Sequence, residues 1–151
     1  MKKEDYVYIK YRENESIDPE LKEFWYQDLK FALGDTDFVI LDEIFIEPSH
    51  RNKGIGSEII KDFIKHHENS IILVRAGALQ KEYPLEPTKE EYQLILERLS
   101  KFYTKLGFKN INKYSRTYEF SDIYVYTGND EGIDFYEKVK NYYSDNATKI
   151  E

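Results

Sequence analysis

Apolar residues follow two different spacings along the chain, and the order of these spacings predicts an α/β fold. A nearly continuous apolar run at 38–46 predicts a buried β-strand, which Pro48 ends. Directly after it, apolar residues recur at helical spacing from Ile55 to His67. A further apolar run at 71–74 predicts a second strand. Two strands separated by a helix favour parallel pairing with a right-handed crossover.

The chain before this unit carries weaker versions of the same patterns. Alternation at 6–11 predicts a first strand. Asp18 and Pro19 form a typical helix start, and an apolar stripe runs from there to Leu33. Gly34 fits the end of that helix, so one strand and one helix are expected before the long strand.

The chain after this unit predicts another helix and two short strands. Thr88 and Glu91 fit a capping box, which starts an amphipathic helix that Gly107 ends. Strand-like segments follow at 108–114 and 123–126, and the second alternates isoleucine or valine with tyrosine. Together with the β-α-β unit, these elements predict one α/β domain with a mixed sheet.

The 151 residues are sufficient for one domain with its own core, and no linker, repeat or low-complexity segment divides them. A last helix at 132–143 and a loose polar tail after Ser144 complete the predicted order. The chain has no cysteine and no signal-peptide core, and no apolar run approaches the ~20 residues that cross a bilayer. These features predict one cytoplasmic α/β domain with a mixed sheet and without a membrane segment.

Charge is distributed unevenly along the chain. The net charge of −7 argues against a nucleic-acid partner, because such binding depends on a basic surface. Residues 13–47 carry a net charge of −9, from two basic and eleven acidic residues, whereas residues 48–127 carry +3, from thirteen and ten. Solvated faces are the simpler explanation of such blocks. The functional interpretation is that the acidic part attracts a cationic amine and the basic part holds an anionic cofactor.

A basic glycine turn joins the long strand directly to the helix that follows it. This turn spans 50–56 and reads His-Arg-Asn-Lys-Gly-Ile-Gly. The first N–H groups of a helix have no partner within the helix and lie at the positive end of its dipole, so such a turn binds anions, above all phosphates. The spacing matches neither the nucleotide P-loop nor the dinucleotide fingerprint.

Two motifs in this order resemble those of the GCN5-related N-acetyltransferases. The pattern Arg-x-x-Gly-x-Gly at 51–56 resembles the acetyl-coenzyme A turn of that family, and Phe-Tyr-Thr-Lys-Leu-Gly-Phe at 102–108 resembles its helix-to-strand junction. The resemblance implies a single acetyltransferase domain with a mixed, mostly antiparallel sheet, a central parallel strand pair and flanking helices. It assigns the core to 38–126, an atypical and shortened acceptor-side part to 1–37, and a C-terminal helix and tail to 127–151.

The resemblance also implies an acetyl-coenzyme A-dependent transfer to an amine, in which the amine attacks the thioester directly. The backbone of Phe45 and Ile46 would pair with the pantetheine arm. Tyr103 would be the general acid, because a phenol of reference pKa ~10 is protonated at neutral pH. Tyr103 also lies on the apolar stripe of its helix, where a core aromatic is the alternative. The turn residues assigned to the pyrophosphate are Arg51, Asn52, Lys53, Gly54, Ile55, Gly56 and Ser57.

A carboxylate near the long strand is expected to help deprotonate the amine. The candidates are Asp42, Glu43 and Glu47. On a regular strand Glu43 and Glu47 share one face, while Asp42 points with Ile44 and Ile46. Glu43 is the favoured base, and a β-bulge would reverse this assignment of faces.

The departures from the family pattern concern the acceptor side. Only 37 residues precede the long strand, and Leu96 and Leu99 stand where a cofactor-binding asparagine and a small residue are common in the family. A shortened acceptor side favours an open groove for a cationic amine on a peptide, a protein or a polyamine. The alternative is a non-catalytic module that keeps the fold and binds another protein. No metal is expected, because the adjacent His66 and His67 face apart on a helix; a homodimer is compatible with the sequence.

Overall fold

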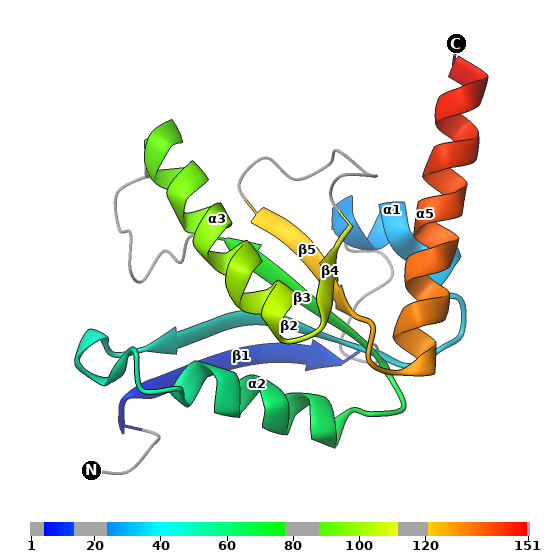
Figure 1. Cartoon of the computed structure of the whole chain (residues 1–151). Helices are drawn as coiled ribbons and strands as arrows, with labels where there is room; N and C mark the ends of the chain where they lie inside the picture. Colours follow the sequence, from blue (N-terminus) through cyan, green and yellow to red (C-terminus); the bar gives the residue numbers. More distant parts are fainter. Residues whose placement is uncertain (1–4, 14–23, 78–87, 112–120, 151) are drawn as a thin grey trace.

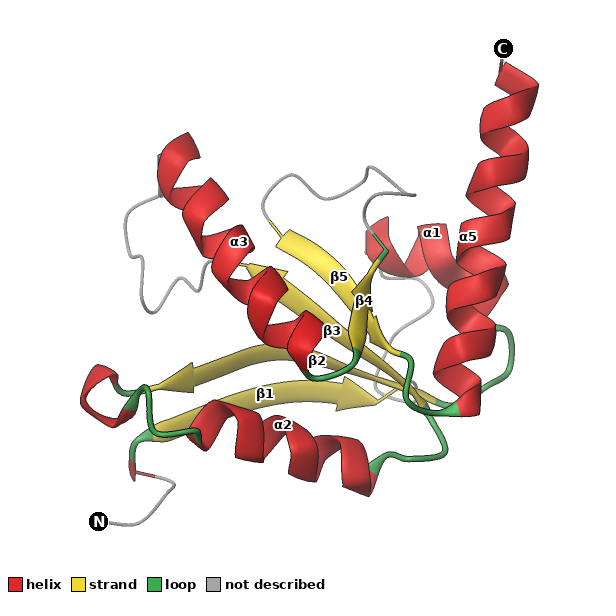
Figure 2. Ribbon diagram, in the orientation of Figure 1, coloured by secondary structure: helices red, strands yellow, loops and turns green. Residues whose placement is uncertain are grey.

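A mixed five-stranded sheet forms the centre of the computed structural model, which describes residues 5–13, 24–77, 88–111 and 121–150 (Figure 1). The helices cover both faces of the sheet, and α1 stands beside α5, away from α2 and α3 (Figure 2). The main elements are β1 (Val7–Glu13), α1 (Phe24–Leu33), β2 (Phe38–Ile46), α2 (Ile55–His66), β3 (Ile71–Gly77), α3 (Lys89–Lys105), β4 (Phe108–Asn110), β5 (Ser121–Tyr126) and α5 (Asp130–Ile150).

The strands are ordered β1-β2-β3-β5-β4 across the sheet. Strands β2 and β3 are parallel, and the pairs β1–β2, β3–β5 and β4–β5 are antiparallel. This arrangement confirms the predicted mixed, mostly antiparallel sheet with a central parallel pair. The β2-α2-β3 crossover, predicted from the apolar pattern, supplies that parallel pair.

The first part of β2 contributes to two hydrophobic cores, one on each face of the sheet. Phe38 and Ile40 pack with α1 and α5, through residues such as Phe135. Val39 and Leu41 pack on the opposite face with α2 and α3. This alternation is the ordinary pleat of a strand buried on both sides, which explains why the segment reads as a continuous apolar run.

Helix α3 begins and ends as its sequence predicts. The Thr88 side chain accepts a hydrogen bond from the Glu91 amide, and the Glu91 carboxylate accepts one from the Thr88 amide. Gly107 follows the helix with a φ of 95°, a left-handed conformation that glycine adopts at little cost. The reciprocal cap and the glycine end fix the length of the helix that faces the glycine turn.

The predicted end of the chain is wrong. Helix α5 starts at Asp130, where the Asn129 side chain accepts a hydrogen bond from the Gly132 amide, and it continues to Ile150. The tail after Ser144 is therefore helical rather than loose. Its polar composition was misleading, because no glycine or proline after Gly132 interrupts the helix.

Three sequence-based predictions lie outside the described residues. They are the helix start at Asp18 and Pro19, the loop at 79–87, and the part of the strand at 108–114 that follows Ile111. Within the described chain, β4 covers Phe108–Asn110 of that predicted strand.

Candidate functional site

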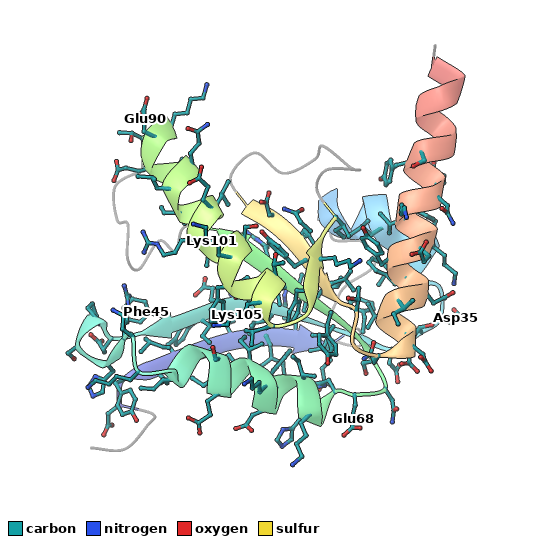
Figure 3. All side chains as sticks on the ribbon, in the orientation of Figure 1. Asp35, Phe45, Glu68, Glu90, Lys101 and Lys105 are labelled. Carbon is teal, nitrogen blue, oxygen red and sulfur yellow. The ribbon has the colours of Figure 1, made fainter. Side chains whose placement is uncertain are left out.

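A pocket of about 430 Å³ lies between the end of β2, the start of α2 and helix α3. In Figure 3, Phe45 marks its place at the end of β2, beside the turn that leads to α2. The lining combines apolar and basic side chains with glycine backbone. The lining residues are Ile44, Phe45, Ile46, His50, Arg51, Asn52, Gly54, Ile55, Gly56, Ser57, Arg98, Leu99 and Phe102.

The turn at the mouth of this pocket presents backbone N–H groups. Gly54 is the N-cap of α2 and has a φ of 78°, and Asn52 before it has a φ of 64°. The first hydrogen bond of the helix runs from the Glu58 amide to the Gly54 carbonyl, 3.1 Å. The amides of residues 55–57 therefore precede the helical ladder and lie at its positive end. This geometry suits a phosphate.

Gly56 holds the start of α2 close to two other elements. A Cβ atom at this position would lie 3.4 Å from Phe102 Cζ on α3 and 3.5 Å from Ile46 Cδ1 on β2. A side chain larger than a methyl group would have to displace these neighbours or fill the pocket. The second glycine of the motif thus serves packing, whereas the first, Gly54, serves the backbone conformation.

Two arginines bring positive charge to the pocket. Arg51 Nε donates a hydrogen bond to the Ile46 carbonyl, 2.8 Å, and its guanidinium carbon lies 5.3 Å from the centre of the Phe45 ring. Arg51 therefore ties the turn to the end of β2 as well as supplying charge. Arg98 reaches the pocket from α3, one turn before Phe102.

Sequence reasoning found most of the lining but not all of it. Arg98 was missed, although its spacing of four residues from Phe102 places both on one face of α3. His50 was not assigned a role, and it stacks on the Tyr6 ring at 4.0 Å. Lys53, predicted to contact the cofactor, is exposed and is not among the lining residues.

Beyond Leu41, strand β2 loses one of its two neighbours. The parallel ladder to β3 ends at the pair Leu41–Val74, although β2 continues to Ile46 and β3 to Gly77. Figure 1 shows the ends of these two strands pointing apart. Among the described strands, the second half of β2 pairs with β1 alone, so its other edge can take an extended ligand.

A β-bulge interrupts β2 where this separation begins. Tyr11 of β1 pairs with Leu41 and Lys10 pairs with Glu43, so Asp42 is an extra residue between them. Leu41 and Ile44 both pack on the side of α2 and α3, which reverses the alternation of a regular strand. The grouping of Asp42 with Ile44, predicted for a regular strand, is therefore wrong, and the bulge that was predicted to reverse it is present.

The bulge places the three candidate carboxylates in different surroundings. Asp42 pairs with Arg12, through distances of 2.6 Å from Nε and 2.9 Å from Nη2. Glu43 pairs across the ladder with Lys10, on the face opposite α2 and α3, and is half-buried. Glu47 is exposed after the end of β2. Glu43 remains the candidate base, on the face away from the pocket.

Tyr103 lies in the core under α3 and not in the lining of the pocket. Its side chain is 2% exposed and packs among Phe102, Phe108 and Tyr124. Burial, with a smaller contribution from Tyr124, raises the pKa of the Tyr103 phenol well above its usual value. The phenol is therefore protonated at neutral pH, as a proton donor requires.

The neighbouring Tyr124 also carries a buried hydroxyl, which has no hydrogen-bond partner in the described structure. Burial raises the pKa of the Tyr124 phenol, and the Ser100 and Asn110 side chains oppose this shift, because they lie close enough to favour the charged form although neither meets the geometry of a hydrogen bond to the hydroxyl. Tyr124 pairs across the sheet with Val74, the last residue of β3 that β2 reaches. The two phenols thus lie beside the point where the strands separate.

The described residues contain no group of three histidine, cysteine or carboxylate side chains that could hold a metal ion. None of the described helices is both long and apolar enough to cross a membrane.

Comparison with known proteins identifies the family. The family described as "Acetyltransferase (GNAT) domain" matches residues 20–110, more than half of the chain. No curated protein and no solved structure matches the chain significantly. The matched range contains the pocket, the bulge and both motifs, and the sheet has the predicted topology. The chain belongs to the GCN5-related N-acetyltransferase family, whose members use acetyl-coenzyme A.

Proposed function

We propose that the protein transfers an acetyl group from acetyl-coenzyme A to a primary amine by direct attack of the amine on the thioester. The observation that carries this proposal is the pairing of β2 immediately before the glycine turn. There β2 pairs with β1 along one edge, while the ladder to β3 along its other edge has already ended. A strand edge that has no strand partner among the described residues and the helix amides that precede the ladder of α2 then border one pocket, which suits a ligand with an extended arm and a phosphate end.

The residues at the turn fit the phosphate end of such a ligand. Gly56 brings the helix amides close to the pocket, and Arg51 and Arg98 supply positive charge. Glu58 stands in the first turn of α2, where its carboxylate competes with a bound phosphate for the positive end of the helix dipole. Its side chain is exposed and does not line the pocket. We assign the pyrophosphate to the amides of 55–57 and to the two arginines, with the exposed Lys53 as a secondary contact.

The open edge of β2 fits the arm. Residues 44–46 line the pocket, and β1 occupies the other edge of the strand. The bound cosubstrate would supply the activated acetyl group, as a thioester with a thiolate leaving group. Ile46 keeps its predicted role as a backbone partner of the arm through its N–H, since its carbonyl already accepts a hydrogen bond from Arg51. The predicted role of Phe45 needs correction: the Glu47 amide donates to the Tyr6 carbonyl, so by the alternation of the ladder Phe45 directs its backbone groups toward β1, and Ile44 takes its place at the open edge.

We assign proton transfer to Tyr103 and Glu43. The Tyr103 phenol would give its proton to the leaving sulfur, and Glu43 would accept a proton from the amine through water. Because Tyr103 is 2% exposed, its donation requires the cosubstrate sulfur to reach under α3 beside Leu41 and Val74. Catalytic hydrogen bonds often form only in the complex, so we expect this contact to form when the cosubstrate binds.

The proposed acceptor is a cationic amine, such as a lysine or N-terminus of a peptide or protein, or a polyamine. The acidic segment 13–47 supports this, and Glu43 has no ion pair within the described residues. The face of β1 and β2 opposite α2 carries Glu43 together with Tyr8, which is exposed. A cytoplasmic setting and a homodimer are parts of the same proposal.

A second candidate function is that of a non-catalytic module, which keeps the fold and binds another protein. The burial of Tyr103 outside the pocket lining favours it, because a core aromatic needs no catalytic role. In that case the pocket would bind coenzyme A without turnover, or would bind no cofactor.

Exchange of Tyr103 for phenylalanine distinguishes the two functions. The experiment measures coenzyme A binding by calorimetry, and acetylation of lysine peptides, polyamines and neutral amines by mass spectrometry. We expect Tyr103→Phe to bind coenzyme A as the unmodified protein does and to acetylate cationic amines roughly 10²- to 10⁴-fold more slowly.

Tyr142→Phe provides the matched control, since Tyr142 lies exposed on α5. It should leave both binding and rate unchanged. Absence of coenzyme A binding by the unmodified protein would refute the enzyme proposal. Binding without turnover of any amine would favour the module. Equal turnover of neutral and cationic amines would refute the proposed acceptor class.

A further inference from the structure

The ion pair between Arg12 and Asp42 joins β1 to the extra residue of the β2 bulge. Arg12 stands opposite Ile40, and Asp42 has no partner in the ladder. Two nitrogen atoms of the guanidinium contact both carboxylate oxygens, at 2.6 and 2.9 Å. This forked geometry is the strong and directional form of the arginine–carboxylate interaction.

The Arg12–Asp42 pair is buried enough to select one pairing register between β1 and β2. The Asp42 side chain is 8% exposed and that of Arg12 is 22% exposed. A carboxylate with so little access to water is costly without a partner, so registers that separate it from Arg12 are disfavoured. Specifying a register is the best-attested use of a buried ion pair.

The register decides which side chains reach the pocket. With the bulge at Asp42, Ile44 and Ile46 turn toward α2 and α3, where they line the pocket. Without the bulge, regular alternation would send these residues to the opposite face and bring Phe45 toward α2 and α3. One extra residue therefore sets the composition of the pocket wall.

The bulge also coincides with the end of the ladder between β2 and β3. Pairing stops at Leu41 and Val74, the row directly before Asp42. A bulge bends its strand and increases the local twist, which carries the rest of β2 away from β3. The gap for an extended ligand thus begins at the residue that Arg12 holds.

We propose that Arg12 and Asp42 are a positioning pair, which fixes the bulge in β2 and so sets the gap that admits the pantetheine arm of coenzyme A. This inference rests on the proposed function. It predicts that the pair governs binding of the arm and not binding of the phosphates, because the glycine turn is held separately by Arg51 and Gly56.

The test compares two ligands in calorimetry. Coenzyme A has both the nucleotide and the arm, whereas 3′-phosphoadenosine diphosphate has the nucleotide and its phosphates alone. We expect Asp42→Asn to weaken binding of coenzyme A at least about tenfold and to leave binding of the nucleotide unchanged. Arg12→Lys, which keeps the charge and loses the fork, should show the same selective loss to a smaller degree.

Asp134→Asn is the matched control, because it breaks the exposed ion pair of Asp134 with Lys138 on α5. It should change neither affinity. Thermal unfolding of each variant shows whether it is folded, and Arg12→Lys serves as the milder probe if Asp42→Asn unfolds.

The outcomes separate this inference from the proposed function. Selective loss of coenzyme A binding supports the positioning pair. Equal loss for both ligands, as a purely structural role predicts, would overturn it, as would unchanged affinity for both. If the unmodified protein binds coenzyme A no more tightly than the nucleotide, the inference fails while cofactor binding stands. If it does not bind coenzyme A, the proposed function fails with it.

Discussion

The two halves of β2 have similar apolar sequences and different surroundings. Phe38–Leu41 is buried, and its residues 39–41 have strand neighbours on both sides. Residues 44–46 have β1 on one side and the pocket on the other, and they are half-buried. The bulge at Asp42 divides the halves. The first half supports the fold, and the second half supports the candidate site.

The candidate site arises because the ladder between β2 and β3 ends at Leu41, and not because the residues beyond it are unusual. Ile44 and Ile46 would suit a core strand as well as Val39 and Leu41 do. They line a pocket because the ladder to β3 stops before them. Variants that act on one half should therefore affect stability and binding in different proportions.

The largest effect is expected for the loss of stability in Ile40→Ala, compared with that in Ile44→Ala. Ile40 is 0% exposed, and its truncation should lower the free energy of unfolding by ~2–5 kcal/mol, because the packed core cannot close the cavity. Ile44 is half-buried and lines the pocket, so its truncation should cost ~1–2 kcal/mol and weaken coenzyme A binding. Denaturant unfolding and calorimetry measure the two effects. Equal losses of stability in both variants would contradict the division of β2.

Most of the fold could be predicted because its signals are local. The β-α-β unit, the capping box at Thr88 and the glycine end at Gly107 each depend on residues close in sequence. The error at the end of α5 has a physical cause, since a polar composition predicts exposure and does not by itself end a helix.

The candidate site could be predicted in part. The glycine turn was identified because its residues adjoin one another, and the structure gathers most of them around one pocket. The bulge could not be located, since it depends on pairing between β1 and β2, which lie about thirty residues apart. Arg98 was missed for a related reason: nothing near it in sequence shows that α3 faces the turn.

A medium effect is expected at the turn that follows the open half of β2. Gly54→Ala places a Cβ atom at a φ of 78°, which should cost ~1–2 kcal/mol of stability, although no atom lies within 4 Å of that Cβ. The altered turn should also weaken coenzyme A binding, because Gly54 is the N-cap of α2.

Gly34→Ala provides the matched control for Gly54→Ala. Gly34 has a φ of 54°, and its added Cβ would also meet nothing within 4 Å, but it follows α1 and is not in the pocket lining. The two variants should therefore lose similar stability in thermal unfolding. Coenzyme A binding should fall in Gly54→Ala alone. A parallel fall in both would show that the effect of Gly54 on binding is an effect of stability.

The smallest effect is expected at the row of residues where the two halves meet. Tyr124 pairs with Val74 in that row, and its buried hydroxyl has no hydrogen-bond partner among the described residues. An unpaired buried hydroxyl costs stability and a phenylalanine ring fills nearly the same space, so Tyr124→Phe should raise the free energy of unfolding by about 1 kcal/mol.

Tyr126→Phe is the control for Tyr124→Phe, because Tyr126 lies two residues further along β5 and is only half-buried. Its hydroxyl is not among the buried unpaired groups, so its removal should bring no gain in thermal stability.

The outcomes for Tyr124→Phe distinguish a role in the reaction from a role in the core. A gain in stability together with slower acetylation would show that the unpaired hydroxyl is kept for the reaction, beside Tyr103. A gain with unchanged acetylation would assign Tyr124 to the core. A loss of stability would show that the hydroxyl has a partner in solution, and the end of the β2–β3 ladder would then be more polar than its burial indicates.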